Sequence, residues 1–164
     1  MLKQSLPFVL LGSLILGCEP TVSASNDPAT TQPTTFPVQK TKDEWKKILP
    51  EMTYYVMFEA GTERPFRNEF NDFKGKGTYV SAATGTPLFS SKDKYDSGTG
   101  WPSYTKPIDE KAVILRVEPD GSGRVEVLDA SSGGHLGHVF DDGPAPTGKR
   151  YCMNSAAMKF VPEK

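Results

Sequence analysis

The polar side chains best suited to chemistry lie in one segment near the C-terminus, residues 133–160 (GGHLGHVFDDGPAPTGKRYCMNSAAMKF). Apolar runs on either side of the turn-forming residues DDGPAPTGK predict a strand, a long loop and a second strand. Residues two apart on a strand share a face, so Arg150, Cys152 and Asn154 are expected to point the same way. A nearby cation favours the thiolate form of a cysteine, which indicates a nucleophile at Cys152. The alternative is a cysteine that only fills space in an apolar strand.

The same segment contains both histidines of the chain, His135 and His138. On a regular strand, residues three apart face opposite sides, but a bulge or turn at Gly137 would bring the two rings together. They could then act as proton donors or as metal ligands. With Cys152 they could supply the three protein ligands of a catalytic zinc site. The chain has no Cys-x-x-Cys pair, so we do not expect a structural zinc.

Two further positions border this candidate site. Trp101 lies in a glycine-rich loop (KYDSGTGWPSY) and could form the wall of a pocket, although a tryptophan folded back as an apolar plug is an equally plain interpretation. Asp141 and Asp142 precede the turn before Arg150. They indicate either a polar part of the site or a solvated turn with a surface ion pair.

The N-terminal 40 residues have the composition of a targeting segment and a linker. Residues 1–17 (MLKQSLPFVLLGSLILG) carry an early lysine and then an uncharged apolar run, which predicts a signal peptide. The run ends in Ile-Leu-Gly-Cys, which resembles a bacterial lipobox, so we expect Cys18 to be acylated. Residues 18–40 are rich in Pro, Thr and Ser and predict a flexible tether. Residues 41–164 are the expected catalytic domain, and these roughly 120 residues are enough for one core.

The order of apolar runs in residues 41–164 predicts a mainly β fold. Thr41 and Glu44 form a capping box for a short helix that ends before Pro50. Phe66, Phe70 and Phe73 have helix-like spacing and are expected in the core. In residues 123–128, valines alternate with Arg124 and Glu126, which places these two charged residues on a solvated face. The predicted β segments are 51–60, 78–83, 112–117, 123–128 and 150–160.

Charge and composition narrow the classes of partner. The net charge is −1, with 19 basic and 20 acidic residues, and no arginine-rich face is evident. We therefore expect no nucleic-acid partner. We expect a monomer that is attached to a membrane through its lipid anchor.

Several blocks in the same order resemble the B-type methionine sulfoxide reductases, which act on the R epimer of methionine sulfoxide. The similarity runs from Trp45 to Phe160, essentially the whole domain. The blocks are YV (79–80), GTPLFSS (85–91), KYDS (94–97), GTGWPSY (98–104), HLGHVFDDGP (135–144) and RYCMNSAAMKF (150–160).

The resemblance implies two antiparallel β-sheets with short peripheral helices. It implies reduction of methionine (R)-S-oxide in proteins to methionine, through a sulfenic acid on the cysteine. It also implies the roles of the site residues: Cys152 as nucleophile, His135, His138 and Asn154 on the polar side of the site, Trp101 as the wall for the substrate methyl group, and Asp142 and Arg150 as supporting positions at the substrate.

Two departures from the family pattern change the expected chemistry. Many members hold a structural zinc with two Cys-x-x-Cys pairs, whereas the corresponding positions here are Ser81, Thr84, Asp129 and Ser132. The chain thus resembles a zinc-free branch, and no cofactor is expected. Members that resolve the sulfenic acid internally often have cysteine where this chain has Thr99. We therefore expect an external thiol reductant, such as a thioredoxin-like protein.

The sequence predicts a lipid-anchored, zinc-free repair enzyme of the cell envelope with its domain outside the cytoplasm, on the periplasmic side in a Gram-negative cell. Its partners are oxidised proteins that carry methionine sulfoxide. One alternative is a metal-binding lipoprotein that uses His135, His138 and Cys152. Another is a non-catalytic binding module of the envelope.

Overall fold

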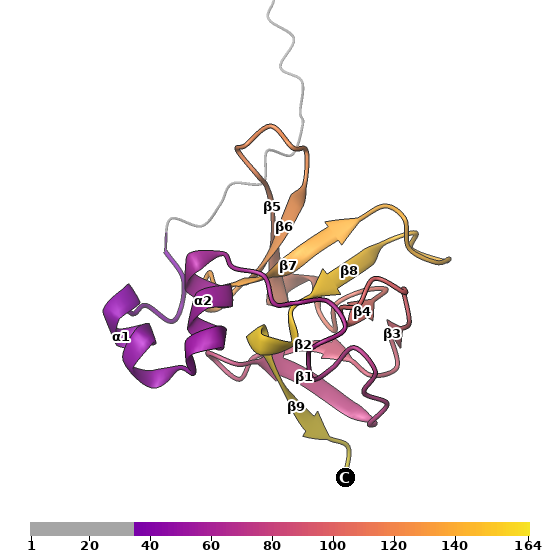
Figure 1. Ribbon diagram of the computed structural model, residues 1–164, viewed down its shortest axis with the longest axis horizontal. Coiled ribbons are helices and arrows are strands. Elements are labelled where there is room, and N and C mark those ends of the chain that lie inside the picture. The colour runs from indigo at the N-terminus through magenta and orange to yellow at the C-terminus, as the bar shows by residue number, and fades with distance from the viewer. Residues whose placement is uncertain (1–34) are drawn as a thin grey trace, which may run out of the picture.

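Two antiparallel sheets pack against each other, and two short helices lie at one side of them in the computed structural model (Figure 1), which describes residues 35–164. The expected fold class is therefore confirmed. The three-stranded sheet has the order β2-β1-β9 and the six-stranded sheet the order β3-β4-β8-β7-β6-β5. The elements are α1 (Lys42–Ile48), α2 (Glu51–Glu59), β1 (Gly77–Ser81), β2 (Pro87–Ser90), β3 (Lys94–Tyr95), β4 (Ser103–Tyr104), η1 (Glu110–Ala112), β5 (Val113–Val117), β6 (Val125–Asp129), β7 (His135–Phe140), β8 (Arg150–Met153), η2 (Ser155–Ala157) and β9 (Met158–Pro162).

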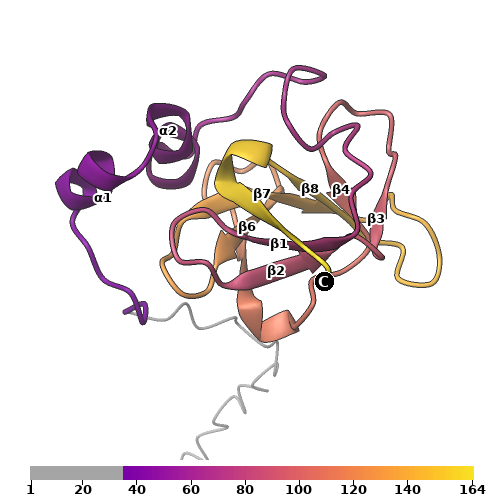
Figure 2. The same cartoon turned by 90° about the horizontal axis from the view of Figure 1, so that it is seen from below.

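The helix α1 begins at the expected capping box. The Glu44 amide donates to Thr41 Oγ1 at 3.2 Å, and the Thr41 amide donates to the Glu44 carboxylate at 2.7 Å. The two side chains thus accept hydrogen bonds from two backbone amides that would otherwise lack a partner at the start of the helix. Trp45 is the buried residue of α1, and its ring stacks on Phe58 of α2 with centroids 4.8 Å apart. The helices thus pack on each other (Figure 2).

The prediction of a β segment over residues 51–60 is wrong, because this segment is the helix α2. Its aromatic and β-branched residues favour a strand locally. However, its buried residues are Thr53, Tyr54, Val56 and Met57, a spacing that gives one face of a helix. Ala60 ends the helix in the left-handed conformation, and the Gly61 amide returns to the Tyr55 carbonyl at 3.0 Å.

The phenylalanine series was only partly interpreted correctly. Phe70 is buried at 1% exposure, and Phe73 packs against the core, but Phe66 is 66% exposed. These residues lie in turns and bends rather than in a helix. Between the sheets, Phe89 stacks on Tyr104 at 4.5 Å, and Tyr79 meets Tyr104 edge-on at 5.1 Å.

The core also includes three methionines, Met57, Met153 and Met158, whereas Met52 on α2 is 52% exposed. Besides α1, the helix α2 contacts β7 and η2, so it lies beside the six-stranded sheet where the chain crosses between the sheets. Among residues 35–164, no helix is long and apolar enough to cross a bilayer.

The C-terminal run 150–160 is not one strand. β8 ends at Met153, η2 follows, and β9 pairs with β1 in the other sheet, with Tyr79 opposite Phe160. The chain therefore changes sheets after Met153, one residue beyond Cys152, and Asn154 lies at the crossing rather than within the strand.

Signal peptide, Cys18 and most of the predicted tether lie outside the described residues. Within the described part, the Val38 amide donates to the Ser131 carbonyl at 2.8 Å. The Phe36 ring lies against Gly133, where an added Cβ would come within 2.3 Å of it. Residues 36–38 thus contact the domain beside the loop between β6 and β7.

Candidate active site

One row of side chains crosses the six-stranded sheet and contains the predicted nucleophile. Cys152 on β8 lies opposite His138 on β7 and opposite Ser103 on β4. His138 in turn lies opposite Glu126 on β6, and Glu126 opposite Arg116 on β5. Directly opposed residues of an antiparallel pair share a face. The register therefore places a thiol, an imidazole and a carboxylate side by side on one surface of the sheet.

Of the bulge or turn at Gly137 that would bring the two histidines together, the structure has the bulge. Val127 pairs with Gly137 and Leu128 with His135, so Leu136 is an extra residue between the paired positions of β7. The bulge turns both histidines to one side, with ring centroids 5.3 Å apart and planes at 64°. Gly137 is required for another reason: a Cβ there would lie 2.1 Å from the Cys152 carbonyl oxygen. Any larger residue would push β7 away from the strand of the nucleophile.

A pocket of about 150 Å³ opens over this surface. It has an apolar wall and a polar wall, as a small ligand with one polar atom requires. The lining includes Trp101, Phe140, Cys152, His138, Asn154 and Arg124. The predicted residues Cys152, His138, Trp101 and Asn154 are thus brought together, whereas His135, Asp142 and Arg150 lie outside the lining.

The environment of the Cys152 thiol is partly buried. Burial raises the pKa of Cys152 above its ordinary value, while the hydrogen bond with Thr99 and the charge of Arg150 act in the opposite direction. Thr99 Oγ1 lies 3.9 Å from Cys152 Sγ. The influence of Arg150 has the expected sign, but burial outweighs it, so the net direction differs from the expectation of an acidic thiol. Cys152 is the free cysteine of the described residues.

Arg150 and Asp142 form a bidentate ion pair beside the pocket. The guanidinium donates to both carboxylate oxygens at 2.8 Å, and this bond is the main reason that the pKa of Asp142 is lowered. Arg150 also lies over the Phe140 ring at 4.4 Å. Asp141 pairs instead with Lys149 on the exposed turn. Asp142 therefore holds Arg150, and Arg150 acts on the site through its charge and through Phe140.

Glu63 organises the opposite wall and was missed in the sequence. Its carbonyl accepts the Trp101 indole N–H at 3.1 Å, and its amide donates to Asn154 Oδ1 at 3.1 Å. Its carboxylate accepts the amides of Ser155 and Ala156 at the start of η2. The side chain is buried, and burial raises the pKa of Glu63 despite these bonds. No local pattern around Gly-Thr-Glu-Arg signals these contacts.

Each histidine has a carboxylate partner that the sequence analysis did not identify. His135 Nδ1 lies 2.7 Å from Glu126 Oε1, and His138 Nε2 lies 3.1 Å from Glu118 Oε1. The assignment of Glu126 to a solvated face is wrong, because it is 4% exposed. One signal could have indicated the contact of Glu126 with a histidine: its predicted strand directly precedes the predicted strand of the two histidines in the chain. Both bonds fix the orientation of an imidazole.

The four positions at which the resemblance implied zinc ligands in other proteins, Ser81, Thr84, Asp129 and Ser132, also converge. Asp129 Oδ2 accepts the hydroxyls of Ser81 at 2.7 Å, Thr84 at 3.0 Å and Ser132 at 2.8 Å. Asp129 is fully buried, and its other oxygen accepts the Ser131 amide at 2.9 Å. A network of hydrogen bonds around one carboxylate therefore ties the β1–β2 turn to the β6–β7 loop.

Metal ligation by the histidines and the cysteine finds no support in the geometry. Among residues 35–164, no group of three or more His, Cys, Asp or Glu side chains is arranged to hold a metal ion. His135 and His138 instead direct one nitrogen each to a carboxylate. The zinc-position network contains one carboxylate and three hydroxyls, a donor set poorer than the thiolates and imidazoles that zinc prefers.

Comparisons with known proteins agree with this arrangement. A family profile described as SelR domain matches residues 49–162. A Methanosarcina barkeri protein named peptide methionine sulfoxide reductase MsrB is 49% identical over 128 residues, which cover 77% of this chain and 90% of that protein. A Vibrio cholerae protein named peptide methionine sulfoxide reductase MsrA/MsrB is 49% identical over 130 residues, but the chain covers only 34% of its length. The chain therefore belongs to the SelR domain family, and its resemblance to the B-type methionine sulfoxide reductases is confirmed.

Proposed function

We propose that the chain reduces the R epimer of methionine sulfoxide in oxidised proteins, with Cys152 as nucleophile and His138 as proton donor. The family makes it a peptide methionine sulfoxide reductase, an oxidoreductase. The observation that carries the mechanism is the direct opposition of Cys152 and His138 on neighbouring strands, with both side chains lining one pocket. The thiol and the acid can thus reach the same bound group from adjacent positions.

The reaction begins with the thiolate of Cys152. Because burial raises the pKa of Cys152, the thiol must lose its proton as substrate binds, with Arg150 and Thr99 favouring the thiolate. The thiolate attacks the sulfoxide sulfur, and His138 donates a proton to the sulfoxide oxygen as the sulfur–oxygen bond breaks. Hydroxide or water then attacks the Cys152 sulfur of the resulting sulfur–sulfur intermediate and breaks that bond, which releases methionine and leaves a sulfenic acid on Cys152.

The pocket fits a methyl sulfoxide. Trp101 and Phe140 give apolar surface for the methyl group, while His138 and Asn154 offer donors for the oxygen. Asn154 is buried, and its amide nitrogen donates to the Leu136 carbonyl at 3.1 Å, so its orientation is fixed. His135 does not line the pocket; it binds Glu126, the residue opposite His138 on the sheet.

An external thiol completes the cycle. It condenses with the sulfenic acid, releasing water and leaving a mixed disulfide, which a second thiol reduces. Thr99, rather than a cysteine, is the side chain next to Cys152. We propose a thioredoxin-like protein or a small thiol as the reductant, and no zinc or other cofactor.

The proposed setting is the cell envelope. Residues 1–17 serve as a lipoprotein signal peptide, Cys18 carries the lipid, and the tether holds a monomeric domain outside the cytoplasm. The sequence MLKQSLPFVLLGSLILGC supports this proposal. Labelling of cells with a radioactive fatty acid should mark the wild-type chain, and the Cys18→Ser variant should lose the label.

The activity is tested with the separate R and S epimers of a blocked methionine sulfoxide and with dithiothreitol as reductant. We expect turnover of the R epimer, its loss in Cys152→Ser, and its retention in Cys18→Ser, which removes the other cysteine of the chain. No turnover of either epimer would exclude the proposed reaction. Turnover that survives in Cys152→Ser would exclude this residue as the nucleophile.

A further inference from the structure

The two histidines stand at the ends of two similar series of charged residues. The first series runs from His135 to Glu126, whose other oxygen accepts the Arg116 guanidinium at 2.6 and 2.9 Å. The second runs from His138 to Glu118, whose other oxygen pairs with Arg124 at 2.7 Å. In both, a carboxylate joins one imidazole nitrogen to one arginine, and all three residues lie on β5, β6, β7 or the connection between β5 and β6.

The two series differ in burial and in what they border. The side chains of His135 and Glu126 are 4% and 6% exposed, whereas those of His138 and Glu118 are 16% and 19% exposed. Only the second series reaches the pocket, which both His138 and Arg124 line. The first series is therefore buried behind the site, and the second borders the pocket in which the substrate is proposed to react.

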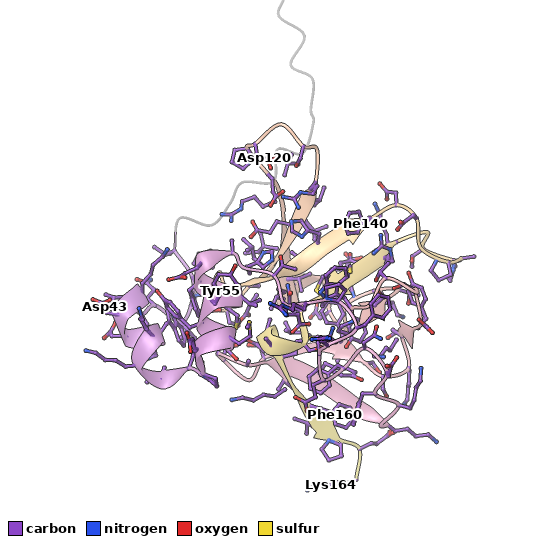
Figure 3. All side chains as sticks on the ribbon, viewed as in Figure 1. Asp43, Tyr55, Asp120, Phe140, Phe160 and Lys164 are labelled. Carbon is purple, nitrogen blue, oxygen red and sulfur yellow. The ribbon has the colours of Figure 1, made fainter. Side chains whose placement is uncertain are left out.

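Glu118 directly follows β5 on the hairpin between β5 and β6, and Asp120 lies at the tip of this hairpin (Figure 3). Two interactions hold Glu118 there: its amide donates to the Arg124 carbonyl at 3.0 Å, and its carboxylate binds the Arg124 side chain. Glu126 is the other carboxylate near His138, but its oxygens are already taken by His135 and Arg116. Glu118 is therefore the carboxylate left to orient His138.

We infer that Glu118, held by Arg124, is a positioning residue that fixes the orientation of the His138 imidazole and keeps a proton on its Nε2. A carboxylate can only accept a hydrogen bond, so the nitrogen that faces it carries the proton. The ring is thus oriented before substrate arrives. To act as the acid, His138 must be the imidazolium, which gives the proton of its other nitrogen, Nδ1, to the sulfoxide oxygen and remains a neutral ring with its Nε2 proton on Glu118. This inference rests on the proposed function for its role in turnover, but the state of the ring can be measured without substrate.

The first measurement is the ¹⁵N spectrum of the imidazoles in the full chain, recorded at a pH at which a free imidazole is neutral. The chain has two histidines, so His138→Gln assigns both sets of signals. In the wild type we expect His138 to be protonated on Nε2 alone. In Glu118→Ala the signals should move to those of a mixture of both tautomers, and in Glu118→Gln, whose amide oxygen can still accept, they should return toward the wild type.

The second measurement is steady-state kinetics with the R epimer. General acid catalysis contributes about 10²–10⁴-fold to a reaction rate. In Glu118→Ala the His138 imidazole should lose its orientation only in part, so kcat should fall about tenfold, with KM changed by less than about twofold. Glu118→Gln should recover most of this loss. Asp120→Asn is the matched control: it removes a charge from the same hairpin, 3.7 Å from Arg124, without touching His138, and should match the wild type in both measurements.

Unchanged ring signals in Glu118→Ala would overturn the inference, even if kcat fell, because the loss would then have another cause. Changed signals with an unchanged kcat would overturn the role in turnover. An equal loss in Asp120→Asn would show a general effect of charge. If the wild type turned over neither epimer, the proposed function would fail, while the ¹⁵N spectra would still decide whether Glu118 sets the tautomer of His138.

Discussion

His138 and Cys152 lie directly opposite each other on β7 and β8, so the ladder of the six-stranded sheet sets the separation of acid and nucleophile. Sites built on strands hold their geometry more tightly than sites built on loops. The loops contribute the other wall, where Trp101 is held through the carbonyl of Glu63. The reacting side chains thus lie on strands, whereas Trp101 lies on a loop held by hydrogen bonds of Glu63, Phe66 and Asn68.

Replacing Arg150 with methionine should raise the pKa of Cys152 further. Arg150 lowers this pKa by its charge, while burial raises it, so removal of the charge leaves burial less opposed. The thiolate fraction at neutral pH then falls, and alkylation of Cys152 by iodoacetamide should be several-fold slower. Its pH midpoint should move to higher pH. Peptide mass spectrometry would follow Cys152 separately from Cys18, and Lys149→Met, beside it on the exposed turn, should leave the midpoint in place. A midpoint unmoved by Arg150→Met would contradict this account of the thiol.

In the proposed cycle Cys152 is the cysteine that reacts, and an external thiol reduces its sulfenic acid. Replacing Thr99 with cysteine should let a second thiol within the protein take over that step. Thr99 Oγ1 lies 3.9 Å from Cys152 Sγ, so a thiol at position 99 can attack the sulfenic acid at short range. After one equivalent of substrate and no reductant, the variant should show a disulfide between the two positions. The wild type and Thr99→Ser should instead show one added oxygen on Cys152. Accumulation of that oxygen in the Thr99→Cys variant would mean that the two sulfur atoms cannot approach each other.

Replacing Glu63 with alanine should destabilise the domain. The amides of Ser155 and Ala156 lose a buried acceptor, and each unsatisfied buried group costs about 1–3 kcal/mol. Denaturant unfolding should show this loss. Glu69 is exposed and lines the same surface groove as Glu63, so the free energy of unfolding of Glu69→Ala should stay within about 0.5 kcal/mol of the wild type. Equal stability of the two variants would show that the Glu63 bonds are weak.

The pH dependence at Glu63 has a definite sign. Its pKa is raised by burial, so its contribution to stability is fully present below the pKa of the unfolded chain and is lost as the pH rises through the folded pKa. Glu63→Gln stays neutral and should not lose this contribution. Relative to the wild type, the free energy of unfolding of Glu63→Gln should therefore increase between acidic and neutral pH. A constant difference across that range would contradict the raised pKa.

Replacing Asp129 with alanine should loosen the junction between the β1–β2 turn and the β6–β7 loop. Three hydroxyls lose their shared acceptor in a fully buried place, at a cost of about 1–3 kcal/mol for each group that stays unsatisfied. A chelator, in contrast, should change neither the Tm nor the turnover of the wild type, because hydroxyls and a carboxylate hold these positions together. Loss of stability in the chelator would point to a bound metal and against the network as the stabilising element.

Features encoded within a few residues could be predicted from the sequence. The capping box of α1 needs only Thr41 and Glu44. The bulge beside Gly137 was one of two local geometries, with a turn, that the spacing of the histidines left open. The helix α2 could not be predicted in this way, because its aromatic and β-branched residues favour a strand locally. Packing on β7 and η2 instead decides the outcome, and the local preference is overridden by tertiary contacts.

The carboxylates that hold the site could not be predicted, because their partners are distant in sequence. Glu63 binds groups 91 to 93 residues away, and Glu118 binds an imidazole 20 residues away. Glu126 alternates with valines as a solvated residue would. Alternation shows only on which face of a strand a side chain lies. Here the polar face of β6 is covered by the two imidazoles and is not the surface of the molecule.

The burial of the methionines bears on how the enzyme withstands the oxidants whose damage it repairs. Met57, Met153 and Met158 are at most 4% exposed, so an oxidant must wait for a local opening to reach them. Of the four methionines within residues 35–164, Met52 is the one that oxidant meets first, because it is 52% exposed on α2, where a sulfoxide would face water and leave the core undisturbed. A second copy of the chain could restore it. The most exposed of the described methionines thus lies where its oxidation leaves the packed core intact.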